Sequence, residues 1–105
     1  MNEEPQVSRV VDLVAYQSGA VVSRIVVKRD AGNVTLFAFD AGQELSEHTA
    51  PYDALVQVLE GDAAITIARR GHRLQAGDMI VMPAHQPHAV KAVSRLKMLL
   101  TMIRS

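Results

Sequence analysis

Short apolar runs separated by turn signals, many of which contain glycine, follow one another along this chain, and that pattern limits what it can fold into. Turn clusters occupy residues 30–33, 61–62, 69–71 and 75–78. Short apolar runs, which are typical of strands, lie around these clusters at residues 20–29, 34–39, 54–59, 63–68, 72–74, 79–82, 89–93 and 96–103. So many short strands at this spacing predict an all-β domain, either a sandwich or a barrel.

The N-terminal residues differ from this pattern. Residues 1–7 are polar and are expected to be loose. Ser8 is a suitable N-cap for a short helix reaching to about Tyr16, whose apolar face would have to dock on the strands. Because the 105 residues contain no linker, repeat or low-complexity tract, we expect one domain spanning residues 1–105.

Composition argues against several classes of function. A net charge of +0 gives no electrostatic reason to bind nucleic acid or an anionic membrane, and no apolar run approaches the ~20 residues that span a bilayer. The chain has no cysteine for disulfides or thiolate chemistry, and its first residues have no apolar core, so we expect a cytoplasmic protein. With 4% aromatic residues, the interior must be filled by Val, Leu, Ile, Ala and Met.

Two stretches share one combination of features: a glycine turn, an apolar strand and a histidine close to a proline. The first spans residues 42–61 and contains His48, and the second spans residues 77–88 and ends at His88. The two histidines lie about forty residues apart on different predicted strands. They can therefore meet only if the sheet folds over itself.

The first stretch resembles the first motif of the cupin family, in which a glycine is followed by two histidines, a glutamate and a second glycine. Gly42, His48 and Gly61 match that frame. Ala50 stands at the second histidine position and Ala54 at the glutamate position. Two residues that the resemblance would make metal ligands are therefore missing.

The second stretch resembles the second cupin motif, which has a glycine, a proline, another glycine, a histidine and an asparagine. Gly77, Pro83 and His88 match it, whereas His85 and Ala92 replace the later glycine and the asparagine. The resemblance covers roughly residues 34–103 and is closest to small single-domain cupins with an RmlC-like jelly roll. It implies a double-stranded β-helix, in which two antiparallel sheets close a small barrel with a pocket at one end.

Of the family's four ligand positions, the resemblance leaves His48 and His88. Two histidines would hold a divalent transition metal such as Zn, Ni, Fe, Mn or Cu weakly, with its open positions completed by water or a ligand. His85 is a candidate third ligand if its loop turns back toward the site. The alternative is that His48 and His88 bind no metal and form the polar base of the barrel pocket, because a histidine between strands is commonly a hydrogen-bonded core residue.

The alanine substitutions also predict a pocket. Ala50, Ala54 and Ala92 would leave room inside the barrel where the family carries larger polar side chains. Tyr52 would lie at its rim. A mostly apolar pocket of this kind favours a small apolar or aromatic molecule as the ligand.

Other polar residues receive more ordinary interpretations. Asp53 lies one residue before the glutamate position, and strand alternation would turn it to the opposite face. Glu44 and Glu47 are interpreted as loop charges, with an acid/base role as the alternative. His72 and the pair Arg69 and Arg70 are interpreted as solvated turn residues. Met98, Leu100 and Met102 share one face of the last predicted strand and are interpreted as core or dimer contacts.

Three functions are compatible with this sequence. The first is binding of a small molecule without turnover, which the loss of half of the ligand set favours. The second is a metal-dependent enzyme, for example an oxygenase, isomerase or decarboxylase. The third is a metal-free enzyme that uses His48 or His88 as a general acid or base.

The first predicted strand, residues 20–29, also bears on oligomerisation. Its run of Val and Ile would leave an apolar edge exposed in a monomer. We therefore expect a homodimer, because small cupins commonly pack or exchange such strands.

Overall fold

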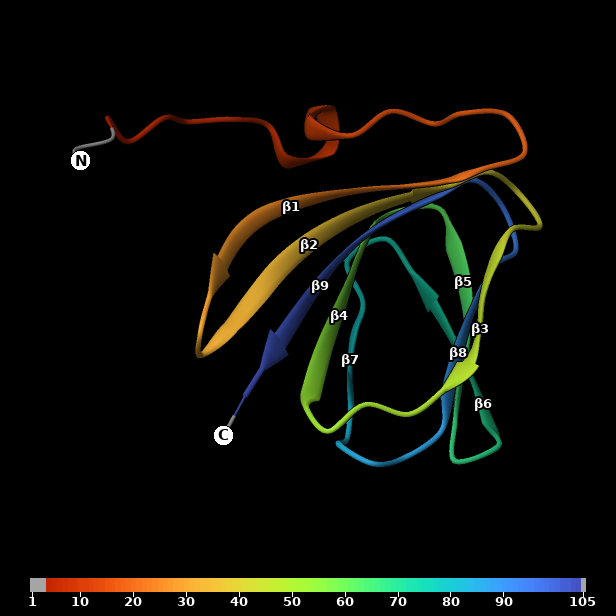
Figure 1. Ribbon diagram of the computed structural model, residues 1–105. Coiled ribbons are helices and arrows are strands. Elements are labelled where there is room, and N and C mark those ends of the chain that lie inside the picture. Colours follow the sequence, from red (N-terminus) through yellow and green to blue (C-terminus); the bar gives the residue numbers. More distant parts are fainter. Residues whose placement is uncertain (1–3, 105) are drawn as a thin grey trace.

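The computed structural model describes residues 4–104 as two antiparallel sheets that enclose a barrel (Figure 1). The five-stranded sheet has the strand order β1-β2-β9-β4-β7, and the four-stranded sheet has the order β3-β8-β5-β6. The strand bounds are β1 Val21–Arg29, β2 Gly32–Phe39, β3 Glu44–His48, β4 Asp53–Glu60, β5 Asp62–Ile67, β6 Arg70–Gln75, β7 Met79–Met82, β8 His88–Ala92 and β9 Leu96–Ile103. The predicted all-β fold with two antiparallel sheets is confirmed.

The chain path is that of a double-stranded β-helix. From β2 onward the chain crosses from one sheet to the other at every connection except β5 to β6. Neighbouring strands within a sheet therefore come from distant parts of the sequence: β9 lies between β2 and β4, and β8 lies between β3 and β5. This winding places the end of β3 beside the beginning of β8, where the two candidate histidines lie.

The predicted N-terminal helix is much shorter than expected. Only Val10–Leu13 is helical, as the 3-10 helix η1, and its N-cap is Arg9, which makes no side-chain capping bond, rather than Ser8. Three valines in residues 10–14 disfavour an α-helix because β-branched side chains lose rotamer freedom against the preceding turn. Residues 1–3 of the tail expected to be loose lie outside the described residues. Within residues 4–104, no helical segment has the length and apolar character needed to cross a bilayer.

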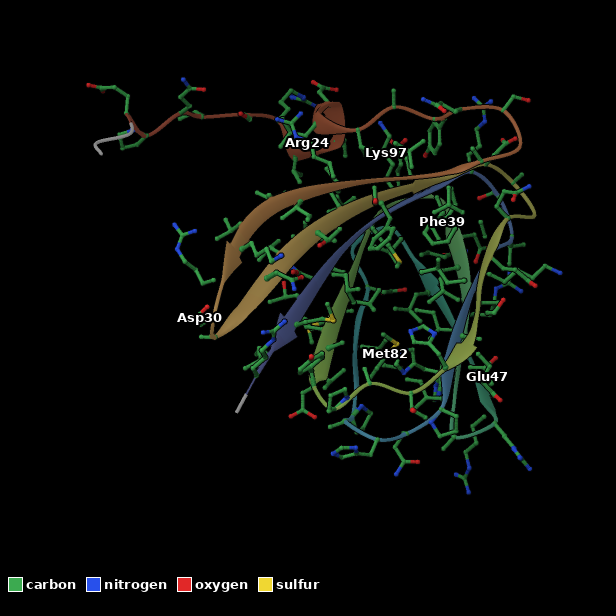
Figure 2. All side chains as sticks on the ribbon, in the orientation of Figure 1. Arg24, Asp30, Phe39, Glu47, Met82 and Lys97 are labelled. Carbon is green, nitrogen blue, oxygen red and sulfur yellow. The ribbon has the colours of Figure 1, made fainter. Side chains whose placement is uncertain are left out.

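The segment of residues 10–20 is bound to the outer face of the five-stranded sheet (Figure 1). Val14 packs there against Leu36 and Ala38 of β2. Lys97 lies beneath the segment and donates a hydrogen bond to the Val11 carbonyl at 2.5 Å (Figure 2). Residues 36 and 38 of β2 are therefore buried on the outer side, just as residue 39 is buried on the inner side.

Tyr16 also joins the N-terminal segment to the sheet, because its hydroxyl donates a hydrogen bond to Glu60 of β4 at 2.6 Å. Burial, reinforced by the carboxylate of Glu60, raises the pKa of Tyr16 well above its ordinary value. The cationic groups of Lys97 and Arg95 lie 5.0 and 5.1 Å from the centre of the Tyr16 ring. Together with the contacts of Val14, these interactions hold the N-terminal segment over one half of the outer face.

The main core lies between the sheets and is almost entirely aliphatic, as the composition predicts. Phe39 and Met82 lie between the two sheets (Figure 2). The largest fully buried side chains of this cluster are Phe39, Ile65, Leu96, Met98, Val56 and Val58. They come from both sheets, so burial of these side chains is what holds the two layers together.

One strand has no counterpart among the predicted runs. The sequence of β3, Glu44–His48, is mostly polar, and only Leu45 in it packs against the core. Its strand conformation comes from antiparallel pairing with β8, with Glu44 opposite Lys91 and Leu45 opposite Val90. Hydrophobic periodicity cannot detect a strand whose partner alone determines its conformation.

Candidate functional site

His48 and His88 face each other across the β3–β8 pair. In the strand register His48 is opposite His88, and Leu45 is opposite Val90. Three residue steps on β3 thus match two on β8, so β3 contains a bulge between Leu45 and His48. A bulge of this kind can re-aim a side chain. It brings the His48 ring to the same side of the pair as His88.

The two rings approach each other through their Nε2 atoms, which lie 3.1 Å apart. The ring centres are 4.3 Å apart and the ring planes meet at 67°. Each Nδ1 lies beside a backbone carbonyl two residues earlier, at 2.7 Å from Ser46 for His48 and at 3.2 Å from Gln86 for His88. A carbonyl oxygen can only accept, so each Nδ1 carries the hydrogen and donates it.

This tautomer has a chemical consequence at Nε2. In a neutral imidazole with hydrogen on Nδ1, Nε2 carries a lone pair and no hydrogen. Two such lone pairs face each other at 3.1 Å between His48 and His88. The arrangement is favourable only if one proton is shared between the rings or if a cation binds both nitrogens.

The two histidines differ in exposure. His88 is only 6% exposed, whereas His48 is exposed to solvent. Burial lowers the pKa of His88, and the proximity of His48 lowers it further, while the carbonyl of Gln86 acts in the opposite direction. His88 therefore favours its neutral form, which has a free Nε2 lone pair.

We expect the lowered pKa of His88 to make the folded protein less stable in mild acid. The unfolded chain takes up this proton near pH 6.5, whereas the folded chain takes it up only at a lower pH, so protonation favours unfolding. The His88 contribution is complete above about pH 6.5 and is lost as the pH falls below it. Melting temperatures of wild type and His88→Gln between pH 5 and pH 8 test this. The variant should show the shallower decline, and His72→Gln, at an exposed histidine, should match wild type.

The sequence and the fold both identify the family. The sequence model described as "Cupin domain" matches residues 35–103, more than half of the chain. The chain belongs to the cupin family. No curated protein sequence matches it.

Several solved structures share the fold of this cupin. A conserved protein of unknown function from Streptococcus pyogenes is 38% identical, with 99% of this chain and 91% of that chain covered and a TM-score of 0.92. A cupin 2 conserved barrel domain protein from Leptotrichia buccalis is 35% identical, with coverage of 90% and 46% and a TM-score of 0.87. A cupin superfamily protein from Desulfitobacterium hafniense is 28% identical, with coverage of 100% and 95% and a TM-score of 0.89.

His85, the candidate third ligand, lies apart from the histidine pair. It has a left-handed backbone, with φ of 68°, its side chain is exposed, and its N–H donates to the Ala50 carbonyl at 2.8 Å. Among the residues that the structure describes, no three His, Asp or Glu side chains are grouped so that they could hold one ion. The pair of His48 and His88 is therefore the part of the predicted metal site that the fold brings together.

The residues predicted to line a pocket occupy different environments. Ala54 is buried in the main core and Ala92 has no exposed surface, so a ligand reaching either would require the core to open. Tyr52 is half-buried, and the guanidinium of Arg104 lies 5.1 Å from the centre of its ring. Ala50 is half-buried and accepts a hydrogen bond through its carbonyl. Of these four residues, only Ala50 and Tyr52 keep surface that a molecule could touch without opening the core.

A hollow of about 320 Å³ lies instead on the outer side of the four-stranded sheet. It is lined by residues of β3, β5 and β8: Glu44, Leu45, Ser46, Glu47, Ala64, Thr66, Ala89, Val90 and Lys91. It is open to solvent, its lining mixes polar and apolar atoms, and neither histidine lines it. Glu44 and Glu47 therefore lie on the outer surface, and Glu47 points away from the barrel (Figure 2).

Asp53 is turned away from the barrel interior, as alternation predicts. It is exposed, and its carboxylate accepts a hydrogen bond from the Ala84 N–H at 2.8 Å. The groups that sequence reasoning missed are the carbonyls of Ser46 and Gln86, which fix the ring tautomers. Backbone acceptors have no sequence signature, although both occur two residues before a histidine.

Proposed function

We propose that this cupin binds a divalent transition-metal ion between His48 and His88, and that the open coordination positions of the ion hold a small molecule at the mouth of the barrel. The observation that carries the proposal is the pair of Nε2 atoms 3.1 Å apart with their lone pairs facing each other. Neutral Nε2 atoms whose Nδ1–H groups are held by carbonyls are the usual form of histidine ligands.

The separation of the two nitrogens fits a single ion. Histidine nitrogens bind such ions at about 2.0–2.1 Å, so two of them subtending an angle between a right angle and the tetrahedral angle lie about 2.8–3.4 Å apart. The 3.1 Å between the Nε2 atoms of His48 and His88 lies within that interval. The carbonyls of Ser46 and Gln86 would act as outer partners that hold the rings in position.

Two protein ligands leave most of the coordination sphere open. Such an ion is held weakly, and its remaining positions are available to water or to a ligand donor atom. When bound, the ion would supply a Lewis acid to that ligand. The core behind His88 is filled by its own side chains, so the small molecule, with an apolar or aromatic body and one coordinating group, would rest at the mouth of the barrel.

Titration of untagged protein with Zn²⁺ or Ni²⁺ by calorimetry near pH 7.5 tests the proposal. We expect one ion per chain with micromolar affinity, and a loss of about a hundredfold in both His48→Ala and His88→Ala, because even outer partners of a metal ligand contribute 10–100-fold. His72→Ala and His85→Ala are the controls and should bind like wild type. Equal binding by wild type and His88→Ala would overturn the proposal.

The small-molecule part is tested separately by thermal unfolding with benzoate, which combines an aromatic ring with one carboxylate. We expect benzoate to raise the melting temperature in the presence of Zn²⁺ and not in its absence. Stabilisation that persists without Zn²⁺ and in His88→Ala would instead indicate a pocket that binds benzoate without a metal ion and without the histidine pair.

A further inference from the structure

Arg70, which the sequence suggested was a turn residue, begins β6 on the face of the four-stranded sheet that lines the barrel. Strand register places His48 opposite His88, and His88 lies opposite Ile67 on its other side. Ile67 in turn lies opposite Arg70. Directly opposed residues of neighbouring strands point to the same face of a sheet, and Ile67 belongs to the main core. These four residues, here called the inner row, therefore cross the inner face of the sheet from edge to edge.

A tight turn fixes the orientation of Arg70. Ala68 and Arg69 connect β5 to β6 with φ of 49° and 66°, the positive values of a two-residue hairpin turn. Such turns favour Asn and Gly, so alanine and arginine here store backbone strain, which is concentrated at functional sites. The Ala68 N–H also donates to the carbonyl of Pro87, the residue before His88, at 2.8 Å. A shift of one residue would turn Arg70 outward, so this turn is what places it on the inner row.

The side chain of Arg70 is exposed and free to meet an anion. Among residues 4–104, the ion pairs are made by other cations, namely Arg9, Arg73, Arg95 and Lys97. The β5–β6 hairpin lies at the end of the barrel where β3 ends and β8 begins (Figure 1). Arg70 and the histidine pair therefore serve the same end of the barrel.

Carboxylates are absent from the surface that an anion would meet there. Those carried by the described strands all lie on the outer faces of the sheets: Glu44, Glu47, Asp53, Glu60 and Asp62. The loops at this end, residues 49–52, 68–69 and 83–87, contain no Asp or Glu. Asp30 lies at the tip of the β1–β2 hairpin, away from the four-stranded sheet (Figure 2). The inner row thus offers a guanidinium and two imidazoles with no competing negative charge.

The distance between Arg70 and the histidine pair limits the length of a ligand that contacts both. Neighbouring strands lie about 4.8 Å apart, so two strand steps separate the Cα atoms of Arg70 and His88 by roughly 10 Å. Guanidinium groups bind carboxylates through two parallel N–H···O bonds. A molecule whose first carboxylate is held at the histidines can therefore present a second one to Arg70, with its body resting over Ile67.

We infer that this site selects small dicarboxylates, and that Arg70 is the residue that sets this specificity. One carboxylate takes an open position of the ion between His48 and His88, and the other pairs with Arg70. The inference rests on the proposed metal-dependent binding and adds to it the charge and the length of the ligand.

Calorimetric titration of the Zn²⁺-loaded protein with terephthalate and with benzoate near pH 7.5 tests the inference. Terephthalate has the ring of benzoate and a second carboxylate opposite the first. We expect wild type to bind terephthalate about tenfold more tightly than benzoate, as a charge-assisted hydrogen-bonded pair provides. Arg70→Gln should lose this preference and keep the Zn²⁺ affinity of wild type, because Arg70 is not a metal ligand. Arg70→Lys should keep part of the preference, since lysine retains the charge but not the paired bonds.

Arg69→Gln is the matched control, because it removes the same charge from the adjacent turn position. It should bind both compounds like wild type. Equal affinities of wild type for terephthalate and benzoate would overturn the inference and leave the proposed function intact, whereas binding of neither compound would overturn both. Equal loss of the preference in Arg69→Gln and Arg70→Gln would also overturn the inference, because it would show an effect of net charge and not of position on the inner row.

Discussion

Replacement of Gly61 by alanine is expected to destabilise this protein by about 4 kcal/mol, a large part of the 5–15 kcal/mol that holds a typical domain folded. Gly61 forms the turn between β4 and β5 with φ of 91°. A Cβ atom there would overlap the Arg95 carbonyl oxygen and lie 2.9 Å from the Leu96 Cα. These are backbone atoms of the turn leading into β9, so relief would require two connections to separate.

Urea unfolding followed by circular dichroism measures this loss. Gly77→Ala is the matched control, because Gly77 has φ of 94° but no neighbouring atom within 4 Å of the added Cβ. The control should lose only the strain of a left-handed alanine, about 1–2 kcal/mol. Equal losses in the two variants would show that conformation alone, and not the collision with Arg95, requires glycine at position 61.

Replacement of Phe39 by alanine is expected to cost about 3–5 kcal/mol, the usual range for a buried phenylalanine. Phe39 ends β2, is 0% exposed, and packs in the main core between the two sheets. Its neighbour Phe37 lies 6.0 Å away between ring centres and is only half-buried. The aromatic content is low, and the surrounding aliphatic side chains can fill the space that Phe39 leaves only in part.

The same urea experiment compares Phe39→Ala with Phe37→Ala. The second variant should lose distinctly less stability, because its ring already retains contact with water in the folded state. A loss of less than about 1 kcal/mol in Phe39→Ala would mean that the sheets close over the missing ring, and would contradict a rigidly packed interior.

Most of the strands were predictable because their signals are local. The predicted runs at residues 79–82 and 96–103 coincide with β7 and β9, and the others lie within two residues of the observed strand ends. The N-terminal helix and β3 were the exceptions. Residues 10–14 follow the surface of the five-stranded sheet rather than helical periodicity, and the polar strand β3 forms because β8 lies beside it.

The candidate site also has one part that the sequence predicts and another part that depends on the tertiary structure. The motif spacing identified His48 and His88, and the fold brings their rings together. The bulge in β3, the ring tautomers and the exposed position of His85 depend on backbone geometry, which residue identity does not encode locally. The burial of Ala54 and Ala92 likewise depends on how far the surrounding side chains reach into the barrel.

The sequence by itself therefore determined the fold class, the cupin motifs and the two histidines, because turns, strand periodicity and motif spacing are properties of short stretches of chain. Only the tertiary structure decided that the Nε2 atoms of His48 and His88 face each other, and that side chains from both sheets fill the barrel around Ala54 and Ala92. Both features join strands that are far apart in the sequence, and their relative positions are set by register and by packing between the sheets.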